Sequence, residues 1–339
     1  MTKPKAQLGF IGMGAMGQDL LRAAVANPRV ELAAAADPDV ASLNAAQGIA
    51  GVGHKSFEDY HELLACKLSG VIVATPQDTH RDICIACLEA GVPTFCEKPL
   101  ALTVRDAALV VETASRRGVP LMIGHVFRYV QPWQAILEWA SSGKFGRPIA
   151  ARIVRAISGW SAWNRAWRLK RAASGGMLLE VSIHEIDWLC CLFGEASEVS
   201  ALGGRYINHE VDYEDIVIAN IAFSNGGIAH LASSCADFLG KHEAEIQFEE
   251  ATIHFDKASG QVRIGHRDNE PGMLTLDELE DRPDAGIYRE LDEFVSACLG
   301  EGEVTIPGED GLRAVKVAEA IYQSVREGRP VSLPLRRER

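Results

Sequence analysis

Near its N-terminus the chain reads Leu8-Gly9-Phe10-Ile11-Gly12-Met13-Gly14-Ala15-Met16-Gly17. The apolar residues predict a strand over Leu8–Gly12, and the residues after the glycines predict a helix over Ala15–Ala26. A G-x-G-x-x-G sequence between a strand and a helix is typical of a loop that binds dinucleotide phosphates. Gly12 permits the tight turn, Gly14 lets the backbone approach a pyrophosphate, and Gly17 lets the helix pack closely on the strand. The free N–H groups at the start of the helix would bind the phosphates.

An acidic residue ends the second strand, which we predict over Val30–Ala36. Asp37 follows Gly17 by the interval of about twenty residues at which a carboxylate accepts hydrogen bonds from the adenosine ribose 2′-hydroxyl. It would repel a 2′-phosphate, and its neighbours Pro38 and Asp39 supply no cation. We therefore predict NAD as the cofactor, with NADP less favoured. The alternative is that Asp37 only caps the next helix.

The remainder of the first 126 residues repeats this alternation of strand and helix. The predicted elements are a helix that Ser56 caps, a strand over Gly70–Thr75, a helix over Thr79–Ala90, a strand over Val92–Cys96, a helix over Thr103–Arg117 and a strand over Leu121–Gly124. Continuous apolar strands that alternate with helices form a parallel sheet covered on both faces. The sequence thus predicts an α/β Rossmann fold, a doubly wound parallel sheet, as an NAD(P)-binding domain over residues 1–126.

After residue 126 the pattern changes, because several strands follow one another with little helix between them. The predicted strands are Ile149–Ile157, Ile216–Phe223, Ile228–Ser234 and Glu245–Phe248. The predicted helices are Gln134–Ser141, a long helix opened by Gly175-Gly176 and closed at Phe193-Gly194, Ile287–Cys298 and Gly308–Arg326. Runs of strands favour an antiparallel sheet. We predict a second, α+β domain over residues 127–339 with a mostly antiparallel open sheet.

The composition excludes several classes of function. Hydrophobic residues at 47% and charged residues at 24% are ordinary for a globular protein of 339 residues. The formal net charge of −12 opposes binding to nucleic acid and to anionic membranes. No apolar run approaches the roughly 18 residues of a membrane span. The eight cysteines lack the paired spacing of a zinc site, so we predict a cytoplasmic protein with reduced thiols and no metal.

Two local patterns suggest catalytic residues. The strand over Val92–Cys96 runs into Glu97-Lys98-Pro99, and strand ends of such sheets face the ligand crevice. Glu180 and His184 lie four residues apart in the long helix and should share a face. A carboxylate beside an imidazole can hold its orientation. On spacing alone, a structural pair or a metal-binding pair is an equally good interpretation.

Together these motifs resemble the glucose–fructose oxidoreductase, inositol dehydrogenase and rhizopine-catabolism (Gfo/Idh/MocA) family. The resemblance rests on the glycine loop, Glu97-Lys98-Pro99 and the helix with Glu180 and His184-Glu185-Ile186-Asp187. It extends over nearly the whole chain through Ala74-Thr75-Pro76 with His80, Gly124 with Arg128-Tyr129, Trp167-Arg168 and the ending Ser324-Val325-Arg326-Glu327-Gly328-Arg329-Pro330-Val331.

The resemblance implies a two-domain dehydrogenase that acts on sugars, inositols or related polyols. It implies that Lys98 binds the reacting oxygen, that His184 exchanges the proton, and that the open sheet forms a homodimer or homotetramer interface. The residues expected to bind the cofactor are Gly12, Met13, Gly14, Ala15, Met16, Gly17, Asp37, Thr75, Pro76, His80, Glu97, Lys98 and Arg128. Two positions depart from the family's pattern: Glu180 stands where its inositol dehydrogenases usually have Asp, and Pro132 falls one residue late after Arg128.

A tryptophan-rich segment precedes the long helix and contains Trp160, Trp163, Asn164, Arg165, Trp167 and Arg168. Its aromatic faces could pack on a sugar ring while its polar groups bind hydroxyls, or the tryptophans could fill an interface. The residues expected to bind substrate are Lys98, Arg128, Trp163, Arg165, Trp167, Arg168, Glu180 and His184.

Two other functions are compatible with the same motifs. The family includes NAD-dependent glycosidases, which oxidise a sugar transiently and restore the cofactor after elimination. A non-catalytic regulator that senses a dinucleotide is the other alternative. Lys98 and His184 argue against a regulator, because a binding protein has no chemical need for them, and so does the acidic charge, which disfavours binding to DNA.

Overall fold

The computed structural model describes residues 5–160, 166–267, 269–275, 279 and 285–335. The chain divides into two compact units. The first comprises Met1–Val126 and Asp284–Leu312, and the second comprises Phe127–Pro283 and Arg313–Arg339. Residues 284–312, which the sequence analysis assigned to the C-terminal domain, thus cluster with the N-terminal unit. Among the described residues, no helix combines the length and the apolar character needed to cross a membrane.

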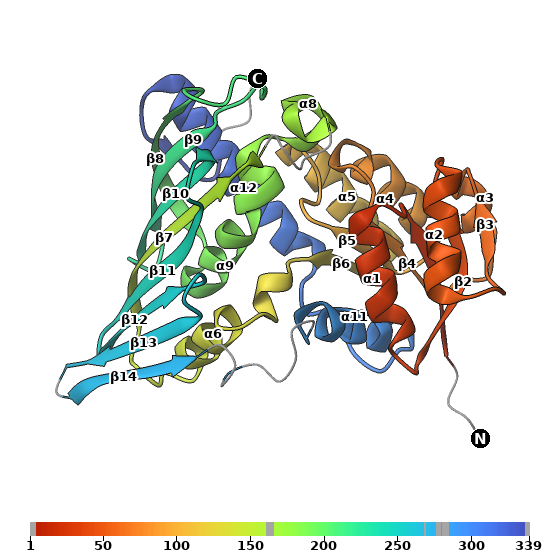
Figure 1. Cartoon of the computed structure of the whole chain (residues 1–339), viewed down its shortest axis with the longest axis horizontal. Coiled ribbons are helices and arrows are strands. Elements are labelled where there is room, and N and C mark those ends of the chain that lie inside the picture. The colour runs from red at the N-terminus through yellow and green to blue at the C-terminus, as the bar shows by residue number, and fades with distance from the viewer. Residues whose placement is uncertain (1–4, 161–165, 268, 276–278, 280–284, 336–339) are drawn as a thin grey trace. The chain divides into compact units, whose positions relative to one another are not determined.

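A six-stranded parallel sheet forms the centre of the first unit (Figure 1). Its order is β3-β2-β1-β4-β5-β6, the order of a Rossmann fold. The strands are β1 (Ala6–Ile11), β2 (Val30–Ala36), β3 (Lys55–Phe57), β4 (Gly70–Val73), β5 (Thr94–Glu97) and β6 (Leu121–Gly124). Every residue of β4, β5 and β6 is buried, as expected for strands covered on both faces. The predicted doubly wound sheet is confirmed.

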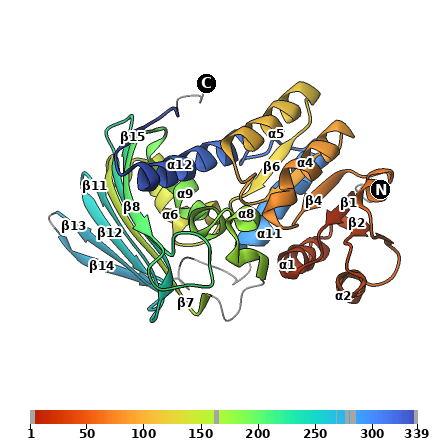
Figure 2. The same ribbon diagram turned by 90° about the horizontal axis from the view of Figure 1, so that it is seen from above.

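Helices cover both sides of this sheet, with α4 and α5 on one side and α1, α2 and α11 on the other (Figure 2). The helices are α1 (Ala15–Val25), α2 (Val40–Ala50), α3 (Tyr60–Leu64), η1 (Gln77–Thr79), α4 (His80–Glu89), α5 (Val104–Arg117) and α11 (Ala285–Cys298). The prediction that Ser56 caps a helix is wrong. Ser56 pairs with Ala35 in the sheet, and Asp59 caps α3 by accepting a hydrogen bond from the His61 N–H.

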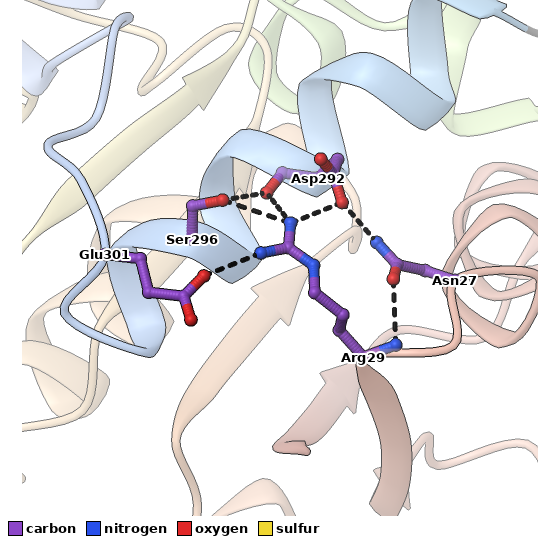
Figure 3. Close-up of polar contacts among 5 residues, drawn as sticks. All are labelled: Asn27, Arg29, Asp292, Ser296 and Glu301. Carbon is purple, nitrogen blue, oxygen red and sulfur yellow. Dashed lines mark hydrogen bonds and ion pairs between the residues drawn. The ribbon is translucent and has the colours of Figure 1, made fainter. Parts of the chain in front are cut away.

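Arg29 fixes α11 to the turn that precedes β2 (Figure 3). Its guanidinium donates to the Asp292 carboxylate at 2.5 Å, to the Ser296 hydroxyl at 3.1 Å and to Glu301 at 2.9 Å. The side-chain amide of Asn27 donates to the same Asp292 oxygen at 2.6 Å. These contacts explain why α11 belongs to the first unit. Sequence periodicity cannot reveal them, because the partners lie far apart in the chain.

The second unit contains a nine-stranded sheet of order β14-β13-β12-β11-β7-β10-β9-β8-β15. Its strands are β7 (Pro148–Ser158), β8 (Ala196–Gly204), β9 (Ile216–Phe223), β10 (Ile228–Asp237), β11 (Lys241–Phe248), β12 (Ala251–Asp256), β13 (Gln261–His266), β14 (Asn269–Thr275) and β15 (Val331–Ser332). Neighbouring described strands run antiparallel except β7 and β10. The predicted mostly antiparallel sheet is confirmed, although β8 and β12–β15 were not predicted.

The helices of the second unit lie on one side of its sheet (Figure 2). They include α6 (Trp133–Ser141), α8 (Arg171–Ser174), α9 (Ile183–Phe193) and the part of α12 (Gly308–Glu327) that falls in this unit. The short turns η2 (Val126–Arg128) and η3 (Ala166–Leu169) accompany them. Buried residues alternate along β10 and β11, which is typical of a sheet packed on one face.

The predicted single helix from Gly175 to Phe193 is interrupted. Helix α8 ends at Gly175 in the left-handed conformation, and a π-helical turn, η4 (Leu178–Ser182), precedes α9. Gly176 has φ +80°, and a Cβ atom there would lie 2.8 Å from the Tyr322 hydroxyl. Gly175 therefore ends α8, and Gly176 leaves space for the Tyr322 hydroxyl. Such π-helical turns occur frequently at functional sites.

Candidate active site

The glycine loop between β1 and α1 has the backbone geometry that dinucleotide binding requires. Gly12 has φ +90°, and a Cβ atom there would lie 2.7 Å from the Ala74 carbonyl group. A Cβ atom at Gly17 would lie only 2.0 Å from the Gly12 carbonyl oxygen. Gly14 precedes the first residue of α1, where N–H groups are free of helical partners. The turn and the close packing therefore both depend on glycine.

Asp37 contacts this loop directly. One carboxylate oxygen accepts a hydrogen bond from the Met13 N–H at 2.7 Å, and the other accepts one from the Asp39 N–H at 2.8 Å. The alternative that Asp37 caps the next helix is wrong, because Asp39 caps α2 by accepting from the Ala41 N–H. Asp37 thus lies where a bound adenosine ribose would be expected in a Rossmann fold.

His80 joins two loops at the carboxyl ends of β4 and β5. Its imidazole is fully buried, with Nδ1 2.8 Å from the Pro99 carbonyl oxygen and Nε2 3.0 Å from the Thr75 carbonyl oxygen. Both ring nitrogens therefore contact backbone groups. Its predicted part in cofactor binding would be indirect, through the loops it joins. Pro76 is exposed beside it, and the Thr75 hydroxyl accepts a hydrogen bond from Thr79.

Lys98 follows the last residue of β5. Because all strands of this sheet are parallel, its position lies at the same sheet edge as the glycine loop and Thr75. Its backbone N–H donates to the side chain of the buried Glu97 at 3.1 Å. The first unit thus brings Lys98 and the predicted cofactor residues to one edge of its sheet, except Arg128, which lies in the second unit.

His184 lies in the first turn of α9, in the second unit. Its imidazole is stacked on the Phe127 ring, with 4.7 Å between the ring centroids and 16° between the ring planes. Glu180 lies in the π-helical turn just before it and is 5% exposed. The Arg168 Nε lies 2.8 Å from a Glu180 carboxylate oxygen, so Glu180 forms an ion pair with Arg168.

Arg128 forms a two-pronged ion pair with Asp187. Its Nε and Nη2 atoms donate to the two oxygens of the fully buried carboxylate at 2.9 and 2.6 Å. This fork geometry is the strongest that a guanidinium makes with a carboxylate. It ties the turn η2 to α9 and to His184. The predicted contacts of Arg128 with cofactor and substrate remain predictions.

The tryptophan segment is described in part. Trp160 is 3% exposed, packs with Met177 and Val181, and donates its indole N–H to the Tyr213 hydroxyl at 2.8 Å. Trp160 therefore fills the core. Trp167 is partly buried, and the Arg168 guanidinium lies 5.1 Å from the centre of its ring. The other predicted members, Trp163, Asn164 and Arg165, lie outside the described residues.

The sequence did not predict a cluster next to His184 that is formed by Phe127, Arg155, Glu185 and His242, of which Glu185 and His242 are buried. The only local signal is that Glu185 follows His184, because the other members come from distant parts of the chain. Within the described ranges, no group of three or more His, Cys, Asp or Glu side chains is placed to hold a metal ion.

Comparison with known proteins shows a match of two family models to the chain. Residues 6–125 match the oxidoreductase family with an NAD-binding Rossmann fold, GFO_IDH_MocA, and residues 140–333 match its C-terminal alpha/beta domain. The chain is 29% identical to 1,5-anhydro-D-fructose reductase of Ensifer adhaerens, over 84% of this chain and 85% of that protein. It is 28% identical to D-glucoside 3-dehydrogenase of Escherichia coli K12, over 98% and 99%.

Solved structures share the fold. The chain superimposes on levoglucosan dehydrogenase in complex with NADH with a TM-score of 0.87. The sequences are 24% identical, and the match covers 98% of this chain and 100% of the other. The two-unit architecture is therefore that of these oxidoreductases.

Proposed function

Because the chain belongs to the Gfo/Idh/MocA family of NAD(H)-dependent oxidoreductases that act on CH–OH groups, we propose that it is a dehydrogenase of a sugar, an inositol or a related polyol. The observation that carries the proposal is the placement of Lys98 at the carboxyl edge of the NAD-binding sheet. In the second unit, His184 supplies an imidazole at the start of α9. We propose the cytoplasm as its location.

The glycine loop of the first unit fits a dinucleotide. A Cβ atom at Gly12 or Gly17 would collide with the backbone, so both positions need glycine, as the phosphate-binding loop of a Rossmann fold does. The glycine loop would hold the pyrophosphate at the start of α1. Asp37 would bind the ribose hydroxyls, since each carboxylate oxygen can accept a second hydrogen bond beyond those from Met13 and Asp39. The negative charge of Asp37 favours NAD over NADP. When bound, the nicotinamide accepts or returns the hydride.

Two side chains would bind the reacting oxygen and exchange its proton. Lys98, when charged, donates a hydrogen bond to the reacting oxygen and stabilises the developing alkoxide. His184 would take the hydroxyl proton, because imidazole is the side chain that most often acts as a general base. In the reverse direction, when a ketone receives the hydride at carbon, His184 would return the proton to the oxygen and Lys98 would again bind that oxygen. The Glu180–Arg168 pair presents an acceptor and a donor, which suit sugar hydroxyls, and the Trp167 face suits a sugar ring.

The test is NADH formation on myo-inositol, levoglucosan, a methyl glucoside, aldoses and sugar acids, with NAD and NADP run side by side. We expect turnover with NAD and at least one of these compounds. His184→Ala and Lys98→Met should each lower kcat by about 10²–10⁴-fold while NAD still binds. Turnover near that of the wild type in either variant would contradict its assignment.

Glycoside cleavage without net NADH would instead support the redox-assisted glycosidase. Binding of NAD, with no turnover or cleavage for any of these compounds, would favour the regulator.

We also propose that the open face of the nine-stranded sheet forms a homodimer or homotetramer interface. Leu202 on β8 and Ile218 on β9 are paired residues that are 77% and 45% exposed, and Ile228 on β10 is 56% exposed. Large exposed apolar side chains on adjacent strands are typical of a protein contact. Leu202→Glu with Ile218→Glu should convert the oligomer to monomer in light scattering, whereas Val52→Glu, at an exposed loop of the first unit, should not. A monomeric wild type would contradict the proposal.

A further inference from the structure

One buried acidic residue of the second unit has no part in the proposed reaction. Glu185 follows His184 on α9, and its side chain is fully buried against the sheet. Burial by itself disfavours its carboxylate, yet the contacts with His242 and Arg155 outweigh this and lower the pKa of Glu185 below its ordinary value. Glu185 is therefore a charged group held inside the unit, and its partners require an explanation.

The partners are paired residues of adjacent strands, Arg155 on β7 and His242 on β11. The His242 Nε2 lies 3.1 Å from a Glu185 oxygen, and the Arg155 Nε lies 3.6 Å from the same oxygen. The Arg155 Nη1 also lies 2.8 Å from the His242 Nδ1. Because a guanidinium only donates, Nδ1 must accept, and the neutral ring carries its proton on Nε2, facing Glu185. Two charged partners thus fix the tautomer and the orientation of His242.

The oriented His242 ring continues into an aromatic stack. It lies 5.7 Å from the Phe127 ring at an interplanar angle of 25°, and Phe127 in turn stacks on His184. Trp133 supports both, 5.2 Å from Phe127 and 5.4 Å from His242. The His184 imidazole is therefore stacked on Phe127, which packs against the His242 ring that Glu185 and Arg155 hold in place.

We propose that His242 is a positioning residue that, held by Glu185 and Arg155, fixes Phe127 and through it the plane of the His184 imidazole. The inference rests on the proposed role of His184 in proton exchange. A general base must meet the hydroxyl proton at hydrogen-bond distance and angle. A ring that can tilt would spend part of its time out of reach, so losing the stack should slow turnover more than it weakens substrate binding.

The test uses the full chain with NAD and the compounds named above. Phe127→Leu removes the ring under His184, and His242→Gln keeps an acceptor and a donor but removes the aromatic face. We expect either change to lower kcat about tenfold to a hundredfold, with KM for NAD and sugar changed less than about threefold. Phe127→Tyr, which keeps the ring, should restore most of the turnover. Phe145→Leu is the control, because Phe145 is a buried phenylalanine that packs among other aromatic rings, those of Trp139, Phe248 and His266.

A second readout does not depend on turnover. In NMR spectra of protein with isotope-labelled histidine, the signal of the His184 ring is identified by its loss in His184→Ala. In the NAD complex, His242→Gln should broaden or shift this signal, whereas Phe145→Leu should leave it unchanged. An unchanged signal and unchanged kcat in both His242→Gln and Phe127→Leu would overturn the positioning role. Should His184→Ala itself keep turnover, the proposed function fails; should it lose turnover while the stack variants keep theirs, only the positioning role fails.

Discussion

Among single residues, Asp37 and Asp39 show how two carboxylates near each other take different roles. Asp39 caps α2, and Asp37 contacts the glycine loop through the Met13 N–H. The sequence alone left both roles open for Asp37, because an acidic residue after a strand serves either purpose. The hydrogen bonds assign the helix cap to Asp39 and the contact with the glycine loop to Asp37.

The preference for NAD depends on Asp37 in this account. Asp37→Ser should weaken NAD binding about tenfold or more, because a hydrogen bond to a charged group contributes about 1.5–3 kcal/mol. It should also raise the affinity for NADP relative to NAD, since the charge that opposes a 2′-phosphate is gone. Calorimetric titration with both dinucleotides measures the ratio. Asp39→Ala is the control, which should cost about 1 kcal/mol of stability as a lost helix cap and leave the ratio unchanged.

At the level of elements, α9 depends on the sheet beneath it through Glu185. The folded-state pKa of Glu185 lies below its ordinary value of 4.5, so its contribution to stability is complete above that pH. The contribution is lost as the pH falls through the lower folded pKa, because the folded and unfolded states then bind the same proton.

Glu185→Gln should therefore lower the free energy of unfolding by about 3–5 kcal/mol at pH 7, the usual cost of breaking a buried ion pair. The difference from the wild type should shrink as the pH falls below 4.5. Denaturant titrations at several pH values measure it. Glu245→Gln breaks a partly exposed pair with Arg152 and should cost less than about 1 kcal/mol. A Glu185→Gln effect that does not change with pH would show that the charge contributes nothing.

Features set by residues close together in the sequence could be predicted, and features set by contacts between distant residues could not. The position of the glycine loop and the position of Lys98 in the fold could be predicted, because each motif lies within a few residues of an apolar strand. The interruption at η4 could not, since Gly175-Gly176 reads equally well as the start of one long helix. The stack of Phe127 on His184 and the pairing of His242 with Glu185 depend on tertiary contacts between distant segments. No periodicity in the sequence carries that information.

At the scale of the whole molecule, the contacts of Arg29 assign a late segment of the chain to the first unit. They join the turn before β2 to α11, which the sequence order alone assigned to the C-terminal domain. The boundaries of the units therefore do not follow a single cut in the sequence. Hydrogen bonds between residues far apart in the sequence determine to which unit a segment belongs.

Arg29→Ala should lower the free energy of unfolding by about 1.5–3 kcal/mol, because a partly buried guanidinium loses its hydrogen bonds to charged partners. Arg22→Ala removes a largely exposed pair with Asp19 and should cost less than about 1 kcal/mol. Thermal and denaturant unfolding compare the two variants. Equal effects would mean that the Arg29 cluster adds nothing beyond a surface ion pair.

The most direct test of the dehydrogenase is the fate of a carbon-bound hydrogen. Ring-deuterated myo-inositol, levoglucosan and a methyl glucoside are incubated with NAD and the wild-type protein, and the cofactor is analysed by mass spectrometry. We expect deuterium in the reduced nicotinamide with at least one compound, and its loss in His184→Ala. Absence of label with every compound, from a protein that binds NAD, would contradict it.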